Sequence, residues 1–303
     1  MKYPRHRWLG FAMVAAATIT PATSHAASQT FNTALPVAKG SLVLREQFLT
    51  IKASDDPSAT DRNLVVFGGV SVLGYGVTSD LALFGVLAYL DKQLNLTMPG
   101  GQRVTRSTRG IGDAQVFARY TTFQKDMRGS NFRVAPFIGL KLPTGNDNDR
   151  DGLARLPQPL QLGSGSWDPF GGVIATYQTL DYEIDTQVSY QANTEANGFE
   201  FGDESRLDAS LQYRLLPREL GAGVPGFLYG VIETNLLHQA KNRLGGASDP
   251  DSGGTTLYLS PGLQYVTRKW VLEAIVQIPV AQDLGGAALE DDFIVRTGFR
   301  VNF

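Results

Sequence analysis

Apolar and polar side chains alternate along the last eleven residues of the chain, Phe293 to Phe303. Phe, Val and Thr occupy one set of alternate positions, and the other set carries Arg296, Arg300 and Asn302. Successive side chains of a β-strand lie on opposite faces, so this segment predicts a strand with one apolar and one polar face. A transmembrane β-barrel needs strands of this kind, because lipid surrounds it and water fills its lumen.

Comparable segments recur along the whole chain. A tilted strand needs about 9–11 residues to cross a bilayer, whereas strands of soluble proteins average about 5–6 residues. Most of the segments here reach the longer value, which favours an all-β transmembrane antiparallel up-and-down barrel. Twelve strands are predicted, with ten and fourteen as the alternatives. The predicted strands are 42–52, 64–77, 81–92, 112–123, 131–142, 168–178, 182–191, 204–215, 226–238, 255–266, 270–280 and 291–303.

The connections between these strands alternate in length. Three of the even-numbered connections are very short, at 78–80, 179–181 and 267–269, whereas the odd-numbered ones are longer and reach their maximum at 143–167. Outer-membrane barrels have short periplasmic turns and longer external loops. If both termini are periplasmic, all of the long connections fall outside the cell.

Aromatic residues gather near the strand ends that face the short turns. Tyr75, Tyr120, Tyr229, Trp270 and Phe303 are examples. Such a cluster is typical of the girdle that outer-membrane barrels place at the membrane interface. Outer-membrane lipid and lipopolysaccharide are therefore expected partners, and the bacterial outer membrane is the expected location.

The N-terminus has the features of a secretory signal. Residues 1–26 combine three basic residues with a short apolar core and end in Ser24-His25-Ala26, a sequence suited to cleavage. We expect a short periplasmic segment over 27–40 and the barrel over 41–303. Removal of the signal changes the formal charge from −2 to about −5, which argues against a nucleic-acid partner.

Polar side chains on the predicted inward faces are candidates for lining the lumen. Their carboxylates can act as an acid/base pair, but the arginines on the same faces favour structural ion pairs. The presence of both signs argues against a strongly ion-selective pore. The candidates are Asp113, Arg119, Arg133, Lys141, Glu183, Asp185, Arg206, Asp208, Arg214, Glu233, Glu273, Arg296 and Arg300.

An enzyme is a weaker hypothesis. After removal of the signal, His238 is the single histidine, and it lies at the outer end of a predicted strand. Nucleophilic catalysis needs a base beside the nucleophile, and no serine has a recognisable pairing with His238. The chain has no cysteine, so a Cys nucleophile is excluded, and no cofactor is expected.

One loop resembles the start of a calcium-binding loop. Asp147, Asp149 and Asp151 precede Gly152 in a D-x-D-x-D-G pattern, but Gln158 stands where the bidentate acid of an EF-hand is expected. A solvated external loop is favoured, and a loose cation site bridging lipopolysaccharide is the alternative.

Three short motifs resemble a known family. Gly110-Ile111-Gly112-Asp113 opens a strand, Pro143-Thr144-Gly145 ends one, and Gly163-Ser164-Gly165-Ser166-Trp167 begins the next. In this order they resemble the "MetA-pathway of phenol degradation" family of proposed outer-membrane transporters, over most of 41–303. The resemblance implies a barrel that passes small hydrophobic or aromatic compounds. The C-terminal Phe303 likewise resembles the terminal residue that the barrel-assembly machinery recognises.

The connection 143–167 is the candidate gate or lumen plug, since glycines flank it and allow it to fold inward. Its residues of interest are Pro143, Gly145, Gly163, Gly165 and Trp167. The alternative is that it covers the outer surface. The sequence thus predicts a channel or transporter for a small-molecule solute. A structural or adhesion barrel is the first alternative, and an outer-membrane hydrolase is the second.

Overall fold

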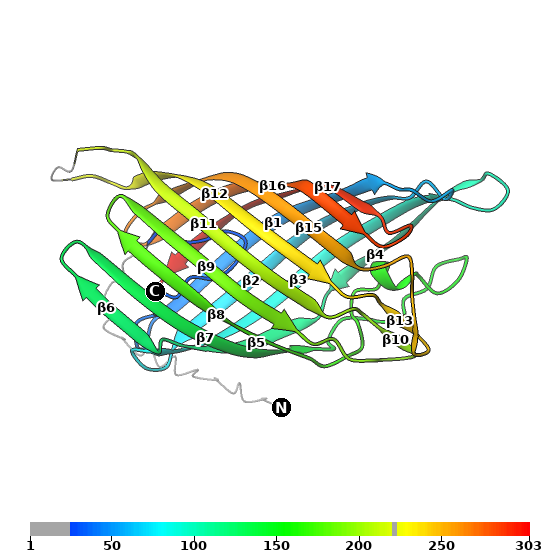
Figure 1. The fold of residues 1–303 in the computed structure, drawn as a ribbon, viewed down its shortest axis with the longest axis horizontal. Helices are drawn as coiled ribbons and strands as arrows, with labels where there is room; N and C mark the ends of the chain where they lie inside the picture. Colours follow the sequence, from blue (N-terminus) through cyan, green and yellow to red (C-terminus); the bar gives the residue numbers. More distant parts are fainter. Residues whose placement is uncertain (1–24, 220–222) are drawn as a thin grey trace, which may run out of the picture.

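The structure is a computed structural model in which residues 25–219 and 223–303 are described. Their strands form a closed antiparallel barrel, seen from the side in Figure 1. Strands that follow one another in the chain pair with one another, and β1 (Leu42–Asp55) pairs with β17 (Glu290–Asn302) to close the ring. The predicted signal lies almost entirely outside the described residues.

The barrel wall has twelve positions, as the sequence predicts. β4 and β5 share one position, because they pair in turn with the outer and inner parts of β3. The remaining wall strands occupy one position each. After β1 they are β2 (Asn63–Gly76), β3 (Leu81–Thr97), β4 (Arg103–Ile111) with β5 (Ala114–Tyr120), β7 (Ser130–Leu142), β8 (Asp168–Thr179), β9 (Tyr182–Gln191), β11 (Glu204–Leu216), β12 (Phe227–Gln239), β15 (Gly254–Val266), β16 (Trp270–Leu284) and β17.

The smaller elements lie at the two ends of the barrel. β6 (Phe123–Met127) forms a hairpin with β7 at the end that carries the short turns. β10 (Phe199–Glu200), β13 (Arg243–Leu244) and β14 (Ala247–Ser248) form a small sheet. Figure 1 places β10 and β13 at the end opposite to β6 and the C-terminus. The single helical element, among the described residues, is the 3₁₀ turn η1 (Gln158–Leu160). None of the described helical residues makes a helix that is long and apolar enough to span a membrane.

One predicted connection is wrong. Residues 93–111 were expected to be a loop, but β3 and β4 pair from Tyr89–Ile111 to Thr97–Arg103 as a hairpin that extends the wall. This hairpin carries charged and polar side chains on both faces, including Lys92, Gln93 and Arg106. A hairpin beyond the apolar band needs no apolar face, so alternation does not reveal it.

The two faces of the wall differ as the alternation predicts. Large apolar side chains such as Ile138 (71% exposed) and Val188 (60% exposed) point outward. The opposite face is polar and buried, and Asp185 and Glu233 are both 0% exposed. The prediction that Tyr229 belongs to the aromatic girdle is wrong. Its side chain is 8% exposed and lies on the inward face of β12 with Glu233.

Backbone hydrogen bonds complete the seam between the first and last strands. The Phe303 N–H donates to the Leu42 carbonyl at 2.8 Å, and the Leu42 N–H donates to the Phe303 carbonyl at 3.2 Å. The Phe303 side chain remains 48% exposed on the outside of the wall. The C-terminal residue therefore belongs to the closure of the ring.

Candidate functional site

The predicted lumen residues lie on the inward face of the wall, with one exception. Asp113 falls between β4 and β5 rather than within a strand. The others alternate with exposed apolar residues of the same strands. They are Arg119 of β5, Arg133 and Lys141 of β7, Glu183 and Asp185 of β9, Arg206, Asp208 and Arg214 of β11, Glu233 of β12, Glu273 of β16, and Arg296 and Arg300 of β17.

Ion pairs account for only part of this lumen. Arg206 contacts Asp208 at 3.4 Å, and Glu273 contacts Arg45, a residue that the sequence did not single out, at 2.8 Å. Arg133 and Arg214 extend toward the end that carries the short turns, where they pair with Asp126 in the β6–β7 hairpin and Asp181 in the β8–β9 hairpin. The fully buried carboxylates of Asp185 and Glu233 instead accept hydrogen bonds from a segment of the chain that lies inside the barrel.

Residues 25–38, called here the N-terminal segment, lie inside the barrel and bind Glu233. One Glu233 oxygen accepts a hydrogen bond from the Gln29 N–H at 2.6 Å. The other accepts from the Thr30 N–H at 3.1 Å and the Thr30 hydroxyl at 2.5 Å. Glu233 is thus the main acceptor for the middle of the segment.

Side chains of β8 and β9 hold the segment on either side of that point. The Ser28 hydroxyl donates to Asp185 at 2.7 Å. Further along, the Ala34 N–H donates to the Thr176 hydroxyl at 2.8 Å, and the Thr33 and Thr176 hydroxyls are 3.1 Å apart. These strands therefore fix both halves of the segment.

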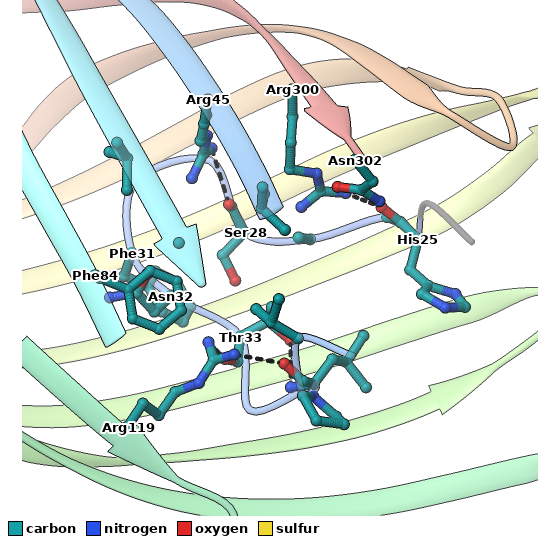
Figure 2. Close-up of a pocket in the computed structure, with 18 of the residues that line it drawn as sticks. His25, Ser28, Phe31, Asn32, Thr33, Arg45, Phe84, Arg119, Arg300 and Asn302 are labelled. Carbon is teal, nitrogen blue, oxygen red and sulfur yellow. Dashed lines mark hydrogen bonds between the residues drawn. The ribbon is translucent and has the colours of Figure 1, made fainter. Parts of the chain in front are cut away.

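The carbonyl groups of the segment have partners as well. Arg45 donates to the Ser28 and Gln29 carbonyls at 3.1 and 3.0 Å. Arg119 donates to the carbonyls of Thr33 and Leu35, and Figure 2 shows its guanidinium directed at Thr33. A chain without secondary structure needs such partners, because buried backbone groups are costly to leave unpaired.

The predicted periplasmic position of residues 27–40 is therefore wrong for most of this stretch. Residues 26–38 carry no charged side chain. Alone they form no strand, and the polar lumen satisfies their backbone instead. Lumen carboxylates that were expected to pair with arginines serve this purpose.

Phenylalanines form an apolar wall within the lumen. Phe117 of β5, Phe137 of β7 and Phe170 of β8 lie with ring centroids 6.1–6.4 Å apart. Phe84 of β3 stacks on Phe117 at 4.6 Å. Edge-to-face and stacked arrangements of this kind are the favoured ones for aromatic pairs. Ala34 of the N-terminal segment packs against this cluster.

A cavity of about 310 Å³ lies beside this wall, on the side of the long connections. We call it the outer cavity. Its apolar side is Phe117, Phe137 and Phe170, and its polar side includes Gln187 and Arg206. Phe117 lies two residues from Arg119, which the alternation placed on the inward face, but the sequence does not mark this ring as part of a site.

A second cavity, of about 140 Å³, lies toward the short turns and is called the inner cavity. Figure 2 shows several of the residues around it. Phe84 and Arg119 line it from the wall, and Pro36 and Val37 line it from the N-terminal segment. The lumen is thus divided along its length.

The three motifs that suggested a family meet at Asp113. One of its oxygens accepts from the Gly145 N–H at 3.0 Å. The other accepts from the N–H and hydroxyl of Ser164, at 2.8 and 2.9 Å. We call this arrangement the Asp113 node. It joins the two ends of the connection 143–167, which is called the outer loop from here on.

Glycine is needed in the node because backbones pack closely there. A Cβ on Gly145 would lie 2.7 Å from the Leu162 carbonyl oxygen and 2.8 Å from the backbone of Gly163. Gly165 has a φ of +76°, which side chains disfavour. These glycines were expected to let the connection fold inward, and here they permit close contact between its two ends. Pro143 follows β7 directly, and Trp167 is 57% exposed and so does not plug the lumen.

The outer loop folds against the inside of the extended wall. The Lys92 ammonium donates to the carbonyls of Pro159 and Gln161 at 3.0 and 2.6 Å. Leu156 and Leu160 are buried against Leu94 of β3. The loop was expected either to fold inward or to cover the outer surface, and in the structure it folds inward.

The acidic side chains of the outer loop contact three different partners and do not converge on a common cation site. Asp147 accepts from Asn197 at 2.5 Å, and Asp149 accepts from Thr108 at 2.7 Å. Arg106 pairs with Asp151 at 2.7 Å, and its hydrogen bonds hold the pKa of that carboxyl well below the usual range. Within the described parts of the chain, no group of three or more His, Asp or Glu side chains is placed to hold a metal.

His238 contacts a threonine on the neighbouring strand. Its Nδ1 lies 2.9 Å from the Thr255 hydroxyl across the β12–β15 pair. The ring stands on the outward face of β12, with Leu236 and Ile232. This position is far from the lumen carboxylates.

A closed twelve-stranded barrel with an apolar outer face and a polar lumen defines a β-barrel protein of the bacterial outer membrane. The family described as "Putative MetA-pathway of phenol degradation" matches residues 51–283, and the chain belongs to this family. The resemblance carried by the three motifs is thereby confirmed.

A solved structure agrees with the fold. An outer membrane channel from Pseudomonas putida F1 is 15% identical over 88% of this chain and 97% of its own, with a TM-score of 0.66. The transport unit of the autotransporter AIDA-I from Escherichia coli is 11% identical, covers 88% of this chain and 91% of its own, and has a TM-score of 0.48. A search of curated proteins found no match.

Proposed function

We propose that this protein is an outer-membrane channel for small hydrophobic or aromatic molecules, and that the outer cavity holds the solute during passage. The observation that carries the proposal is the wall of Phe117, Phe137 and Phe170 inside an otherwise polar lumen. Rings of this kind bind a flat apolar solute through edge and face contacts. A lumen meant only to seal the barrel has no need of them.

The opposite side of the outer cavity suits a polar substituent. Gln115, Gln187 and Arg206 offer donors and acceptors there. A volume of about 310 Å³ admits a small solute but not a folded chain or a long polymer. Apolar pockets with a few placed polar groups are the usual form of small-molecule sites.

The comparisons support the same reading. The family description refers to phenol degradation, and the similar structure from Pseudomonas putida F1 is titled an outer membrane channel. Histidine chemistry has little support, since His238 faces away from the lumen and contacts Thr255. We therefore infer a transport role rather than an enzymatic one.

Uptake into liposomes tests the proposal. Phenol is the probe, and cyclohexanol is the non-aromatic probe of similar size. We expect phenol entry to saturate and to exceed cyclohexanol entry. Replacing two wall rings, in Phe117→Leu/Phe137→Leu, should raise the half-saturating phenol concentration about fivefold to a hundredfold, because two aromatic contacts of about 0.5–1.5 kcal/mol each are lost.

The control is Phe67→Leu, at an outward-facing ring that is 52% exposed. It should transport like the unmodified protein. Equal effects of the lumen and outward substitutions would contradict a solute site at the phenylalanine wall. A barrel that admits neither probe would favour the structural or adhesion alternative.

A further inference from the structure

The N-terminal segment separates the outer cavity from the inner cavity. Gln29 and Thr30 line the outer cavity, and Leu35 and Pro36 line the inner one. Phe31 lines both and is 7% exposed. A solute that moves from one cavity to the other must therefore pass the segment.

The segment is bound by a seat of rigid wall residues. Glu233, Asp185 and Thr176 are each 0% exposed. They come from three strands of the wall, β12, β9 and β8. The seat belongs to the barrel, so it remains in place whether or not the segment occupies it.

The segment itself has features of a removable element. It has no helix or strand, and its residues are mostly small and uncharged. Many of its contacts are hydrogen bonds to lumen side chains, which water can replace. It leads into β1 through Gly40, whose φ of +78° marks a turn at the rim of the barrel.

We propose that residues 27–38 are a gate, which leaves its seat to connect the outer cavity with the periplasmic side of the barrel. In the seated state the segment supplies one side of the outer cavity through Gln29 to Asn32. Unseating it both opens the path and removes that side of the cavity. The part of this inference that concerns solute rests on the proposed function; the part that concerns ions does not.

A reversible covalent lock tests the gate. The chain has no cysteine, so an introduced pair is the sole source of a disulfide. Thr33 of the segment and Thr176 of the seat have hydroxyl oxygens 3.1 Å apart, which suits the short Cβ separation that a disulfide needs. The variant is Thr33→Cys/Thr176→Cys.

The readouts are ion conductance across a planar bilayer and phenol uptake into liposomes, each with and without a reductant. We expect oxidation to abolish most of the conductance and reduction to restore it. Phenol uptake should follow the conductance. Gel mobility of unheated and heated samples verifies folding, and thiol titration verifies the disulfide.

The matched control is Asn95→Cys/Thr105→Cys. These residues face each other in the β3–β4 hairpin, where the Thr105 hydroxyl donates to the Asn95 side chain at 2.6 Å. The control adds the same chemistry outside the lumen, and its conductance should not respond to reductant.

The outcomes separate the two proposals. Conductance that responds to the lock without any phenol uptake would retain the gate and reject the aromatic solute. Equal conductance of the oxidised and reduced lock would overturn the gate. Failure of the folded variant to form the disulfide would overturn the seated segment itself.

Discussion

Two segments occupy the lumen of this barrel, and both donate main-chain N–H groups to a carboxylate of the wall, but they differ in how they are joined to it. The main-chain N–H groups of the outer loop donate to Asp113, which lies between β4 and β5 of the wall. Gly145 and Gly163, near the two ends of the loop, pack against each other. The N-terminal segment is held by strands that are far from it in the sequence, since Gln29 and Glu233 are 204 residues apart. The loop is also covalently joined to the wall at both ends. These differences favour the loop as a fixed lining and support the proposal that the segment is the movable part.

Asp113→Asn should have the largest effect, and only on the outer loop. The amide nitrogen of the asparagine would face N–H groups that now donate to the carboxylate, so at least one of these hydrogen bonds would be lost. A hydrogen bond to a charged group contributes about 1.5–3 kcal/mol. We expect trypsin to cleave after Arg150 or Arg155 about tenfold to a hundredfold faster.

Asp283→Asn, at the same end of the barrel, is the control and should be cut at the original rate. The labelling rate of a cysteine placed at Asn32 should not change in Asp113→Asn. A faster labelling rate there would mean that the two segments are coupled, against the comparison.

Glu233→Gln should release the N-terminal segment. The amide keeps one acceptor oxygen and presents a donor to the Thr30 N–H, which Glu233 now binds. We expect maleimide to label Asn32→Cys roughly tenfold faster, from the same hydrogen-bond energies. Glu204→Gln also alters the outer cavity but not the seat, and should leave labelling unchanged. If both variants label at the original rate while folded, Glu233 does not hold the segment.

Thr176→Val should have a smaller effect of the same kind. It removes the hydroxyl that accepts from Ala34 and keeps the shape of the side chain. A neutral hydrogen bond contributes about 1 kcal/mol, so labelling of Asn32→Cys should rise about fivefold. Thr186→Val, on the outward face of β9, is the matched substitution and should have no effect. A rise in both would point to general loosening of the barrel.

Arg106→Gln should have the smallest effect, on the outer loop alone. The Arg106 and Asp151 side chains are only partly buried, at 11% and 26% exposure, so trypsin cleavage should rise only about twofold and should lose this difference in high salt. Arg106 lowers the pKa of Asp151, so the contribution is present above the ordinary carboxyl range and is lost only as pH falls through the lowered pKa. The difference should therefore persist from about pH 7 to about pH 5. Its loss within that range would contradict the assignment.

The sequence predicts the wall of the barrel well, because lipid and water impose a period of two on every spanning strand. It fails at the β3–β4 hairpin, where that constraint ends and polar residues occupy both faces. Tyr229 was assignable from its even spacing to Glu233, which was already placed inward. The motifs around Asp113 were found, but short motifs do not show that their backbones meet.

The position of the N-terminal segment in the lumen could not be predicted from the sequence, for a different reason. Residues 26–38 have no charge and no periodicity, so nothing in them predicts a partner. Their binding groups are main-chain atoms, which every sequence possesses. The signal lay in the wall instead, in Asp185 and Glu233, which are carboxylates without an arginine partner within salt-bridge distance among the described residues.

The central claim is that the N-terminal segment controls passage through the lumen. Its most direct test is the single-channel conductance of a protein lacking residues 27–38, with a second variant that carries a Gly-Ser replacement of residues 28–35 in case the deletion impairs folding. We expect a larger and more continuously open conductance in either variant than in the unmodified protein. The same conductance in all three, from barrels that are folded, would contradict it.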